Sequence, residues 1–440
     1  MAQYDEEMNK RREKREAMRR RQQAEQRRLR IGLAAAAVVL VLGAVGLFAI
    51  IRKGQEGKPV TEKETAAQTT APTATEPQSS AKPSTTTTIH IKAAGDLNIT
   101  NAVVDSGMSV AGYDYTNAFL DVAPILADAD LTVLNFEGNV CGEPYGTETS
   151  SAPAAILDAL RNAGVDMVQT ANSRSVQNGL IGMSATLQAI RKADLVPLGS
   201  YASNQEFQKS KGYTICNVQG VKVAFVAFTK GVGGMGLPEG NEKCVNLLYT
   251  DYATTYDTVD KDGIRAVLKN AAAEKPDITV AMLHWGSEFN EAIGDAQKKI
   301  VDLMKKEGVD VVIGTHPHLV QKVEFDQAAG TLVAYSLGDF YGDGNRGGTN
   351  YSIILDVEIT KDLTNGSTRV TDFSYVPIYT RAEDESPSGK RQVVRIEEAL
   401  LAYAGEYVDK VTNSAQENMM FALDRIDARV NGKDEPKDKK

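Results

Sequence analysis

The chain contains 440 residues, of which 42% are hydrophobic and 24% are charged, and its formal net charge is −9. A chain of this length can bury one large hydrophobic core or two modest ones. Its three cysteines, Cys141, Cys216 and Cys244, exclude a disulfide framework. They allow at most one internal bridge, for which Cys216 with Cys244 is a guess.

The amino-terminal segment is basic and precedes a long uncharged stretch. Residues 1–30 carry eleven Lys or Arg against six Asp or Glu, and residues 31–51 carry no charge. A helix of that length spans about 30 Å, the hydrocarbon thickness of a bilayer. Arg52 and Lys53 follow at once, where a cleavable signal peptide would have small residues. The sequence therefore predicts a single transmembrane helix at 31–51.

Charge predicts the orientation of that helix, because Lys and Arg beside a span resist translocation. We expect residues 1–30 in the cytoplasm and the main domain outside it, with the chain held in the cell membrane. The lipid bilayer is thus an expected partner. Nucleic acid is not, since no aromatic residue is interleaved with the basic run for stacking on bases.

Residues 52–88 are rich in Thr, Pro, Ala, Glu and Ser and have almost no large apolar side chain. This composition cannot bury enough surface to offset the entropy lost on ordering. The segment is predicted to be a disordered linker between the membrane and the folded domain.

From residue 89 onward, short apolar runs alternate with amphipathic helical patterns, which is typical of an α/β domain. The predicted helices are 154–163, 183–193, 261–274 and 295–307. The predicted strands are 89–94, 131–136, 166–171, 221–228, 277–283, 309–313, 332–335 and 352–359. We place this domain at 89–381. Residues 382–440 are predicted to hold a peripheral helix, at about 397–430, and a charged tail.

Polar clusters follow several of the predicted strands, and in α/β sheets such carboxyl ends form ligand sites. The clusters are Gly95-Asp96, Asn135-Phe136-Glu137-Gly138, Asn172-Ser173-Arg174, His284-Trp285-Gly286-Ser287-Glu288, Gly314-Thr315-His316-Pro317-His318 and Ser336-Leu337-Gly338-Asp339-Phe340. Asp, Asn and Gly also form ordinary turns after strands. Taken one by one, Asp96, Asn172 and Asp339 fit that simpler interpretation.

The positions of the histidines favour a ligand-binding site over ordinary turns. Of the four histidines, His90 begins the first strand, whereas His284, His316 and His318 all lie at strand ends. Imidazole and carboxylate ligands together suit Zn, Mn or Fe, and mixed sets of this kind often hold two ions. The cluster therefore predicts a metal or phosphate site.

The ordered motifs Gly-Asp, Asn-x-Glu, Ala-Asn, His-Trp-Gly-x-Glu, Gly-x-His-Pro-His and Tyr-Ser-Leu-Gly-Asp-Phe resemble the CapA family of capsule and poly-gamma-glutamate synthesis proteins. The resemblance runs from about residue 89 to residue 359. It implies a domain related to calcineurin-like metallophosphatases, a four-layer α/β/β/α sandwich, preceded here by the transmembrane helix.

Carried over residue by residue, the resemblance makes Asp96, Glu137, His284, His316 and His318 ligands of divalent metal ions, two in number, with Mn, Fe and Zn not distinguished. Candidate catalytic positions are Arg174 and His284. Candidate substrate-binding positions are Asn172, Arg174 and Glu288.

The chain departs from the family where Ala-Asn-Asn-His is usual. Ser173 stands in place of an asparagine ligand, Arg174 in place of the supporting histidine, and Gln177 in place of an acid. Arginine stays protonated and cannot serve as a general base, although it can hold a phosphate or carboxylate. The alternative for Arg174 is a surface arginine paired with a nearby acid. Asp339, where asparagine is commoner, adds a charge near the site or shapes a turn.

Three functions remain open at this point. The resemblance favours a role in synthesis or export of an anionic capsular polymer such as poly-gamma-glutamate, beside membrane subunits of a polymer-assembling complex. The five intact ligand positions favour a metal-dependent phosphoesterase or other cell-surface hydrolase. The departures at Ser173, Arg174 and Gln177 leave catalysis uncertain and allow a non-catalytic extracellular binding module.

Overall fold

The computed structural model describes residues 85–404 and 412–433. The predicted cytoplasmic segment, the predicted transmembrane helix at 31–51 and nearly all of the predicted linker lie outside these residues. Within the described ranges, no helix combines the length and apolar character needed to cross a bilayer.

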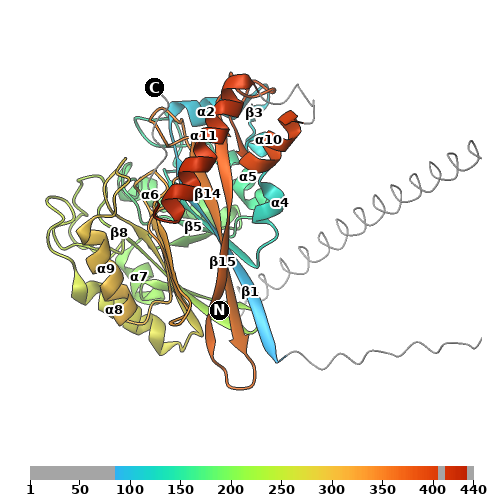
Figure 1. Cartoon of the computed structure of the whole chain (residues 1–440). Coiled ribbons are helices and arrows are strands. Elements are labelled where there is room, and N and C mark those ends of the chain that lie inside the picture. The colour runs from blue at the N-terminus through green and yellow to red at the C-terminus, as the bar shows by residue number, and fades with distance from the viewer. Residues whose placement is uncertain (1–84, 405–411, 434–440) are drawn as a thin grey trace, which may run out of the picture. The chain divides into compact units, whose positions relative to one another are not determined.

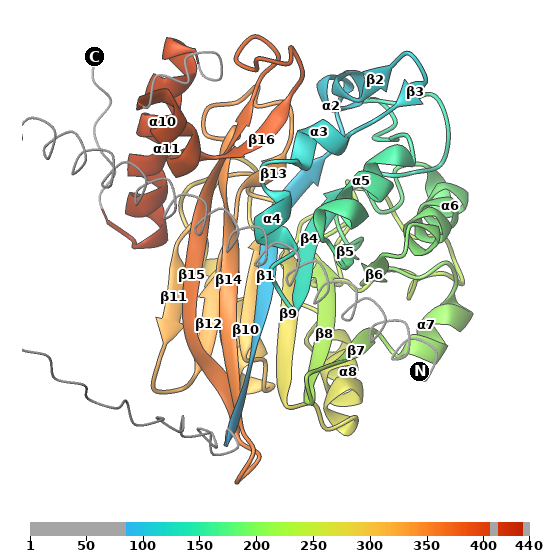
Figure 2. The ribbon, with the colours of Figure 1, turned by 90° about the vertical axis from the view of Figure 1, so that its right-hand side faces the viewer.

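The first sheet has eight strands and is part parallel, part antiparallel (Figures 1 and 2). Seven lie in the order β16 (Gln392–Arg395), β15 (Thr368–Arg381), β14 (Tyr351–Asp362), β1 (Thr86–Asn98), β4 (Leu131–Glu137), β5 (Met167–Gln169) and β6 (Val196–Leu198). The eighth strand, β13 (Asp339–Tyr341), pairs in parallel with the end of β1 and places Asp339 opposite Asp96. From β1 to β6 the strands are parallel, so their carboxyl ends share one edge.

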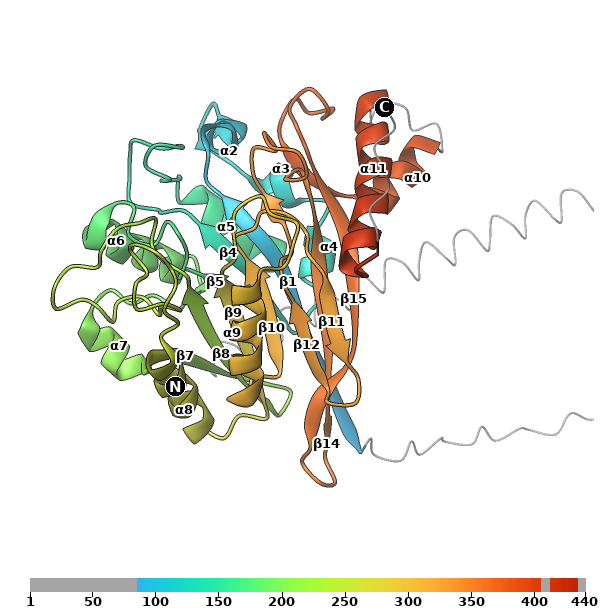
Figure 3. The same cartoon turned by 60° about the vertical axis from the view of Figure 1, so that its left-hand side comes forward.

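The second sheet has six strands, in the order β11 (Val323–Asp326), β12 (Thr331–Ala334), β10 (Val311–Thr315), β9 (Ile278–His284), β8 (Val221–Thr229) and β7 (Tyr213–Val218). In Figure 3, helix α9 lies toward the viewer, with β12 and β11 of this sheet to its right. The four strands from β12 to β8 run parallel, with the antiparallel strands β11 and β7 at the edges.

The two sheets pack against each other through their inner faces. Successive strand residues point to opposite faces, and Val226 and Ala281 contact the helices that cover the second sheet. Their neighbours Phe225 and Val280 are equally buried and so face inward. Gln169 joins the sheets: its Nε2 donates to the carbonyl of Phe228 at 3.4 Å.

Helices cover the outer faces of the sheets (Figures 2 and 3). Against the first sheet lie α2 (Asn101–Ser106), α3 (Thr116–Phe119), α4 (Ala123–Leu126) and α5 (Ala155–Ala163). Against the second lie α8 (Lys261–Ala273) and α9 (Asp295–Lys306). The other described helices are α6 (Gly179–Lys192), α7 (Asn204–Ser210), α10 (Ile396–Ala404) and α11 (Asn413–Val430).

The predicted mixed α/β fold is confirmed, and all eight predicted strands and all four predicted core helices occur close to their expected bounds. The carboxyl-terminal prediction is wrong in two respects. Two helices, not one, occupy the range, because Thr412 caps a new helix by accepting a hydrogen bond from the backbone N–H of Ala415. In addition, α11 buries Met419 and Ile426, and it packs on β14 and β15 rather than lying apart.

The guess that Cys216 pairs with Cys244 is also wrong. All three cysteines are free thiols. Cys216 is buried on β7, and Cys244 is buried in the loop that follows Asn241. The domain therefore folds by burial of apolar surface, without a covalent cross-link between these residues.

Candidate metal centre

The side chains predicted as metal ligands meet where the carboxyl ends of the two sheets come together. Asp96 and Glu137 come from β1 and β4 of the first sheet. His284 ends β9 of the second sheet, and His316 and His318 follow β10. All five are at most 4% exposed. The structure thus brings together every residue of the predicted ligand set.

Two glycines allow this convergence. A Cβ atom built on Gly95 lies 1.7 Å from the carbonyl oxygen of Gly338, and one built on Gly314 lies 1.9 Å from that of Tyr335. No side chain fits at either point, since real Cβ atoms do not approach backbone so closely. Glycine therefore lets β1 and β10 deliver Asp96 and His316 to the same place.

Asp96 and Asp339 flank His318. Nδ1 of His318 lies 2.7 Å from Oδ1 of Asp339 and 3.7 Å from Oδ2 of Asp96. Asn135 donates from Nδ2 to Oδ1 of Asp96 at 2.6 Å, and the backbone N–H of His316 donates to Oδ2 at 3.0 Å. Of the two interpretations of Asp339, a charge near the site or a turn-forming residue, the structure favours the first.

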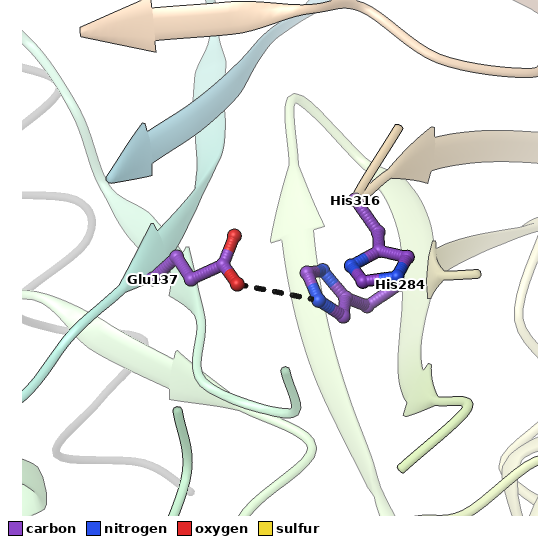
Figure 4. A group of neighbouring side chains, drawn as sticks. All are labelled: Glu137, His284 and His316. Atoms are coloured by element: carbon purple, nitrogen blue, oxygen red, sulfur yellow. Dashed lines mark ion pairs between the residues drawn. The ribbon is translucent and has the colours of Figure 1, made fainter. Parts of the chain in front are cut away.

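Glu137, His284 and His316 form the neighbouring half of the site (Figure 4). Oε1 of Glu137 lies 3.7 Å from Nε2 of His284, and the two imidazole rings are 4.5 Å apart between centroids. Ser173 Oγ lies 3.0 Å from His284 Nε2 and 3.5 Å from His316 Nδ1. Oε2 of Glu137 is buried and has no hydrogen-bond partner.

The backbone at two of the histidines is strained. His316 has φ of +93° and His318 has φ of +59°, in the left-handed region that side chains rarely adopt. Such strain concentrates at sites where the surrounding structure imposes a geometry. Here it turns both imidazoles of the Thr315-to-His318 loop toward the carboxylates.

Burial sets the protonation of the cluster. It raises the pKa of Asp96 to about 6 and that of Glu137 to about 8, because an ionised carboxylate is poorly solvated there. Burial also lowers the pKa of His284 and His316 well below the usual value. For His318 burial acts the same way, but the nearby carboxylates, Asp339 first, raise its pKa well above the usual value.

Three groups of side chains in the described part of the chain have ligand atoms close enough to hold a metal ion. They are Glu137, His284 and His316; Asp96, His318 and Asp339; and Glu288, His316 and His318. Imidazole nitrogens, that of His318 once it has released its proton, and carboxylate oxygens form a donor set for Zn, Mn or Fe. The buried Oε2 of Glu137, which accepts no hydrogen bond, is a further acceptor that a cation would satisfy.

A cleft of about 310 Å³ opens beside the cluster and is lined by Ser173, Arg174, Lys230, Tyr256, Ser287, Glu288 and His316 among others. Arg174 lies at the cleft as expected. Its Nε is buried without a hydrogen-bond partner, and the guanidinium has no ion pair within 4.0 Å among the described residues. The alternative of a surface arginine paired with an acid does not fit this position.

The positions of Asn172 and His284 do not suit the substrate-binding and catalytic roles that were expected of them. Asn172 is buried, and its Nδ2 donates to Asn135 Oδ1 at 3.0 Å and to the carbonyl of Phe136 at 2.7 Å. Both amide hydrogens are thus used inside the protein, which leaves none for a substrate. His284 is wholly buried beneath Ser173 and does not line the cleft, so its position suits a ligand better than a group that contacts substrate.

The sequence analysis missed two residues of the site. The Asn-x-Glu motif predicted no role for Asn135, which hydrogen bonds Asp96 in the structure. Lys230 comes directly after strand β8, and the rule that polar residues at strand ends form the site would have identified it. Gln177, by contrast, donates to the carbonyl of Glu148 and is absent from the cleft lining.

Residues 90–344 match the family described as "Bacterial capsule synthesis protein PGA_cap", and the chain belongs to that family. The resemblance to CapA proteins is thereby confirmed. "PGA biosynthesis protein CapA" of Bacillus subtilis is 27% identical over 280 residues, which cover 62% of this chain and 67% of the relative. "Capsule biosynthesis protein CapA" of Bacillus anthracis is 28% identical over 239 residues, covering 53% and 54%. The chain thus spans two thirds of one relative and about half of the other.

Solved structures show a weaker likeness. A phosphatase from Mycoplasma pneumoniae is 14% identical, with a TM-score of 0.41, and the match covers 67% of this chain and 94% of that one. A hypothetical protein from Thermus thermophilus is also 14% identical, with a TM-score of 0.39, covering 66% and 98%.

The pair of His318 and Asp339 makes a direct prediction. Asp339→Asn removes the carboxylate that does most to raise the pKa of His318, so this pKa should fall in metal-free protein. Titration of the four histidine Cε1–H signals by NMR measures it. A raised pKa stabilises the fold at pH values below it, so D339N should also lose stability mainly in that acidic range.

Asp356→Asn is the matched control, because Asp356 lies 3.0 Å from His90 on β1, outside the cluster. It should leave the His318 titration unchanged. An unaltered His318 pKa in D339N would contradict the charged pair described above.

Proposed function

We propose that this chain is a membrane-anchored, extracytoplasmic component in the synthesis or export of an anionic capsular polymer such as poly-gamma-glutamate, acting through a divalent-metal site. Membership of the PGA_cap family supports the role in capsule synthesis. The observation that carries the metal site is the buried convergence of three carboxylates and three imidazoles, with one carboxylate oxygen that accepts no hydrogen bond.

The domain behind this proposal is a metallophosphatase-type α/β/β/α sandwich. Two facing sheets with helices outside, and a site at their shared carboxyl edge, support that assignment. We propose two ions, one held by Glu137, His284 and His316 and a second by Asp96, His318 and Asp339. A bound divalent ion supplies Lewis-acid polarisation of a phosphoryl or carbonyl oxygen.

The chain's own residues define what happens beside the ions. Arg174 presents a permanently charged guanidinium to the cleft and binds an anionic oxygen without exchanging a proton. Ser173 Oγ lies between His284 and His316, where it orients both rings by hydrogen bonding. The backbone N–H of Arg174 donates to Asn172 Oδ1 at 3.0 Å and fixes the loop. This arrangement favours holding an anionic chain over rapid proton transfer.

The location of the site follows from the predicted helix at 31–51, which we propose anchors the chain in the cell membrane with the domain outside. The predicted linker 52–88 would then give the domain a limited reach around its anchor. Integral membrane subunits of a polymer synthesis or export complex are the proposed partners.

Co-purification tests this placement. An affinity-tagged full chain, extracted from host membranes in mild detergent, should recover integral membrane proteins together with acidic polymer. A chain in which residues 31–51 are replaced by a cleavable signal sequence is the control and should lose these partners. Recovery of the intact chain alone, from the soluble fraction, would contradict the proposal.

A second candidate function is metal-dependent phosphoester hydrolysis, favoured by the buried cluster of carboxylates and imidazoles. The weak point is the absence of a supporting histidine, since positioned acid–base groups contribute about 10²- to 10⁴-fold to such reactions.

Restoring the family residues tests this candidate. Ser173→Asn combined with Arg174→His should raise the turnover of a nitrophenyl phosphate ester in Mn²⁺-loaded protein by about 10²-fold or more. Arg191→His is the control, because Arg191 pairs with Glu206 on the surface. Equal turnover in the double variant and the parent chain would argue against a phosphoesterase weakened at these positions.

A further inference from the structure

Lys230 is a second cation in the cleft. It comes from the second sheet, whereas Arg174 comes from the loop after β5 of the first sheet. Lys230 follows β8, and its backbone N–H donates to the carbonyl of His284 at 2.7 Å, which fixes it beside the metal cluster. Both Lys230 and Arg174 line the same cleft. Two cations from separate elements therefore face one space in a chain of net negative charge.

The ammonium of Lys230 is held in place without a direct ion pair, and Glu288 in the same cleft acts on its charge only from beyond ion-pair distance. Nζ donates to the carbonyl of Gly286 at 2.7 Å and lies 4.6 Å from the ring centroid of Tyr256. An ammonium has three hydrogens to donate, and the structure uses one in a hydrogen bond. In the described ranges no carboxylate oxygen lies within 4.0 Å of Nζ, so the charge remains available to a ligand.

Glycine brings the Lys230 segment close to its neighbours. A Cβ built on Gly231 would lie 2.5 Å from the carbonyl oxygen of Tyr252 and 2.8 Å from the ring of Tyr256. The absence of a side chain there lets Tyr256 pack beneath the lysine. A cation held over an aromatic face in this way has fewer conformations to lose when it binds an anion.

The cleft also continues past Lys230. A second pocket of about 240 Å³ shares Lys230, Tyr256 and Ser287 with it. Asn290, Gly294 and Gln297, at the amino-terminal end of α9, line its far side. Lys230 thus stands at the junction of two adjoining pockets, one beside the metal cluster and one lined by uncharged polar groups.

We propose that Lys230 is a substrate-binding residue that holds an anionic oxygen group of the substrate at this junction, while the adjoining units of the same molecule occupy both pockets. The ligand class is an extended molecule bearing carboxylate or phosphate. This inference rests on the proposed function for the identity of the polymer, but the contact at Lys230 is independent of metal.

Isothermal titration with the full chain tests the contact. The probes are a γ-linked glutamate trimer and inorganic phosphate, each used with metal-free and with Mn²⁺-loaded protein. Lys230→Gln should weaken binding of the anion by about tenfold or more, because it removes a charge-assisted hydrogen bond. Lys230→Arg, which keeps the charge, should restore binding to within about threefold of the parent chain.

Lys222→Gln is the matched control, since Lys222 lies at the start of β8, the strand that Lys230 follows, and donates to the carbonyl of Glu274 away from the cleft. It should bind both probes as the parent chain does. A Lys230-dependent loss for the trimer assigns the site to carboxylates, and a loss for phosphate alone assigns it to phosphoryl groups. Unchanged binding in K230Q, or no binding of either probe by the parent chain, overturns the proposal.

The metal content of each sample separates this inference from the proposed function. Lys230-dependent binding by a chain that takes up no Mn²⁺ would contradict the metal site and leave the role of Lys230 standing. A chain that retains Mn²⁺ but binds both probes equally well in K230Q would contradict Lys230 alone.

Discussion

The structure depends on one electrostatic constraint, the burial of several ionisable side chains at the joint between two sheets. Isolated charges are poorly tolerated in such a place, so they must be neutral, paired or bound to a cation. Here burial lowers the pKa of His284, which favours its neutral form, and His318 forms an ion pair with Asp339. Oε2 of Glu137 accepts no hydrogen bond, and its one ion pair, with Nε2 of His318, is long at 3.9 Å. A divalent cation would satisfy it, and this is the physical reason for regarding the cluster as a metal centre.

Much of the fold and of the ligand set could be predicted from the sequence, because parallel strands buried on both faces produce continuous apolar runs that end in polar clusters. Strand β15 escaped prediction because its first nine residues are mostly half-buried or exposed and form no continuous apolar run. Strands β11 and β16 escaped because each is an edge strand of four residues. The pairing of Asp339 with His318 could not be predicted, because it depends on the register that sets Asp339 opposite Asp96. Lys230 was identifiable and was missed.

The departures from the family pattern acquire a consistent meaning in three dimensions. Ser173 is small enough to lie between two imidazoles, and Arg174 projects a fixed charge into the cleft. Lys230 adds a second charge across that cleft. Together these residues favour retention of an anionic chain beside the metal cluster, whereas an acid–base residue would favour its cleavage. This arrangement is the basis of the proposed role in handling an anionic polymer.

The most direct test of the central claim is the metal itself. Elemental analysis of the purified chain, combined with anomalous diffraction at the Mn edge, should show divalent metal bound between Glu137, His284 and His316. The His316→Ala, His318→Ala variant should lose that metal while keeping its fold. Metal content in the parent chain no higher than in this variant, or an anomalous signal away from the cluster, would contradict the account.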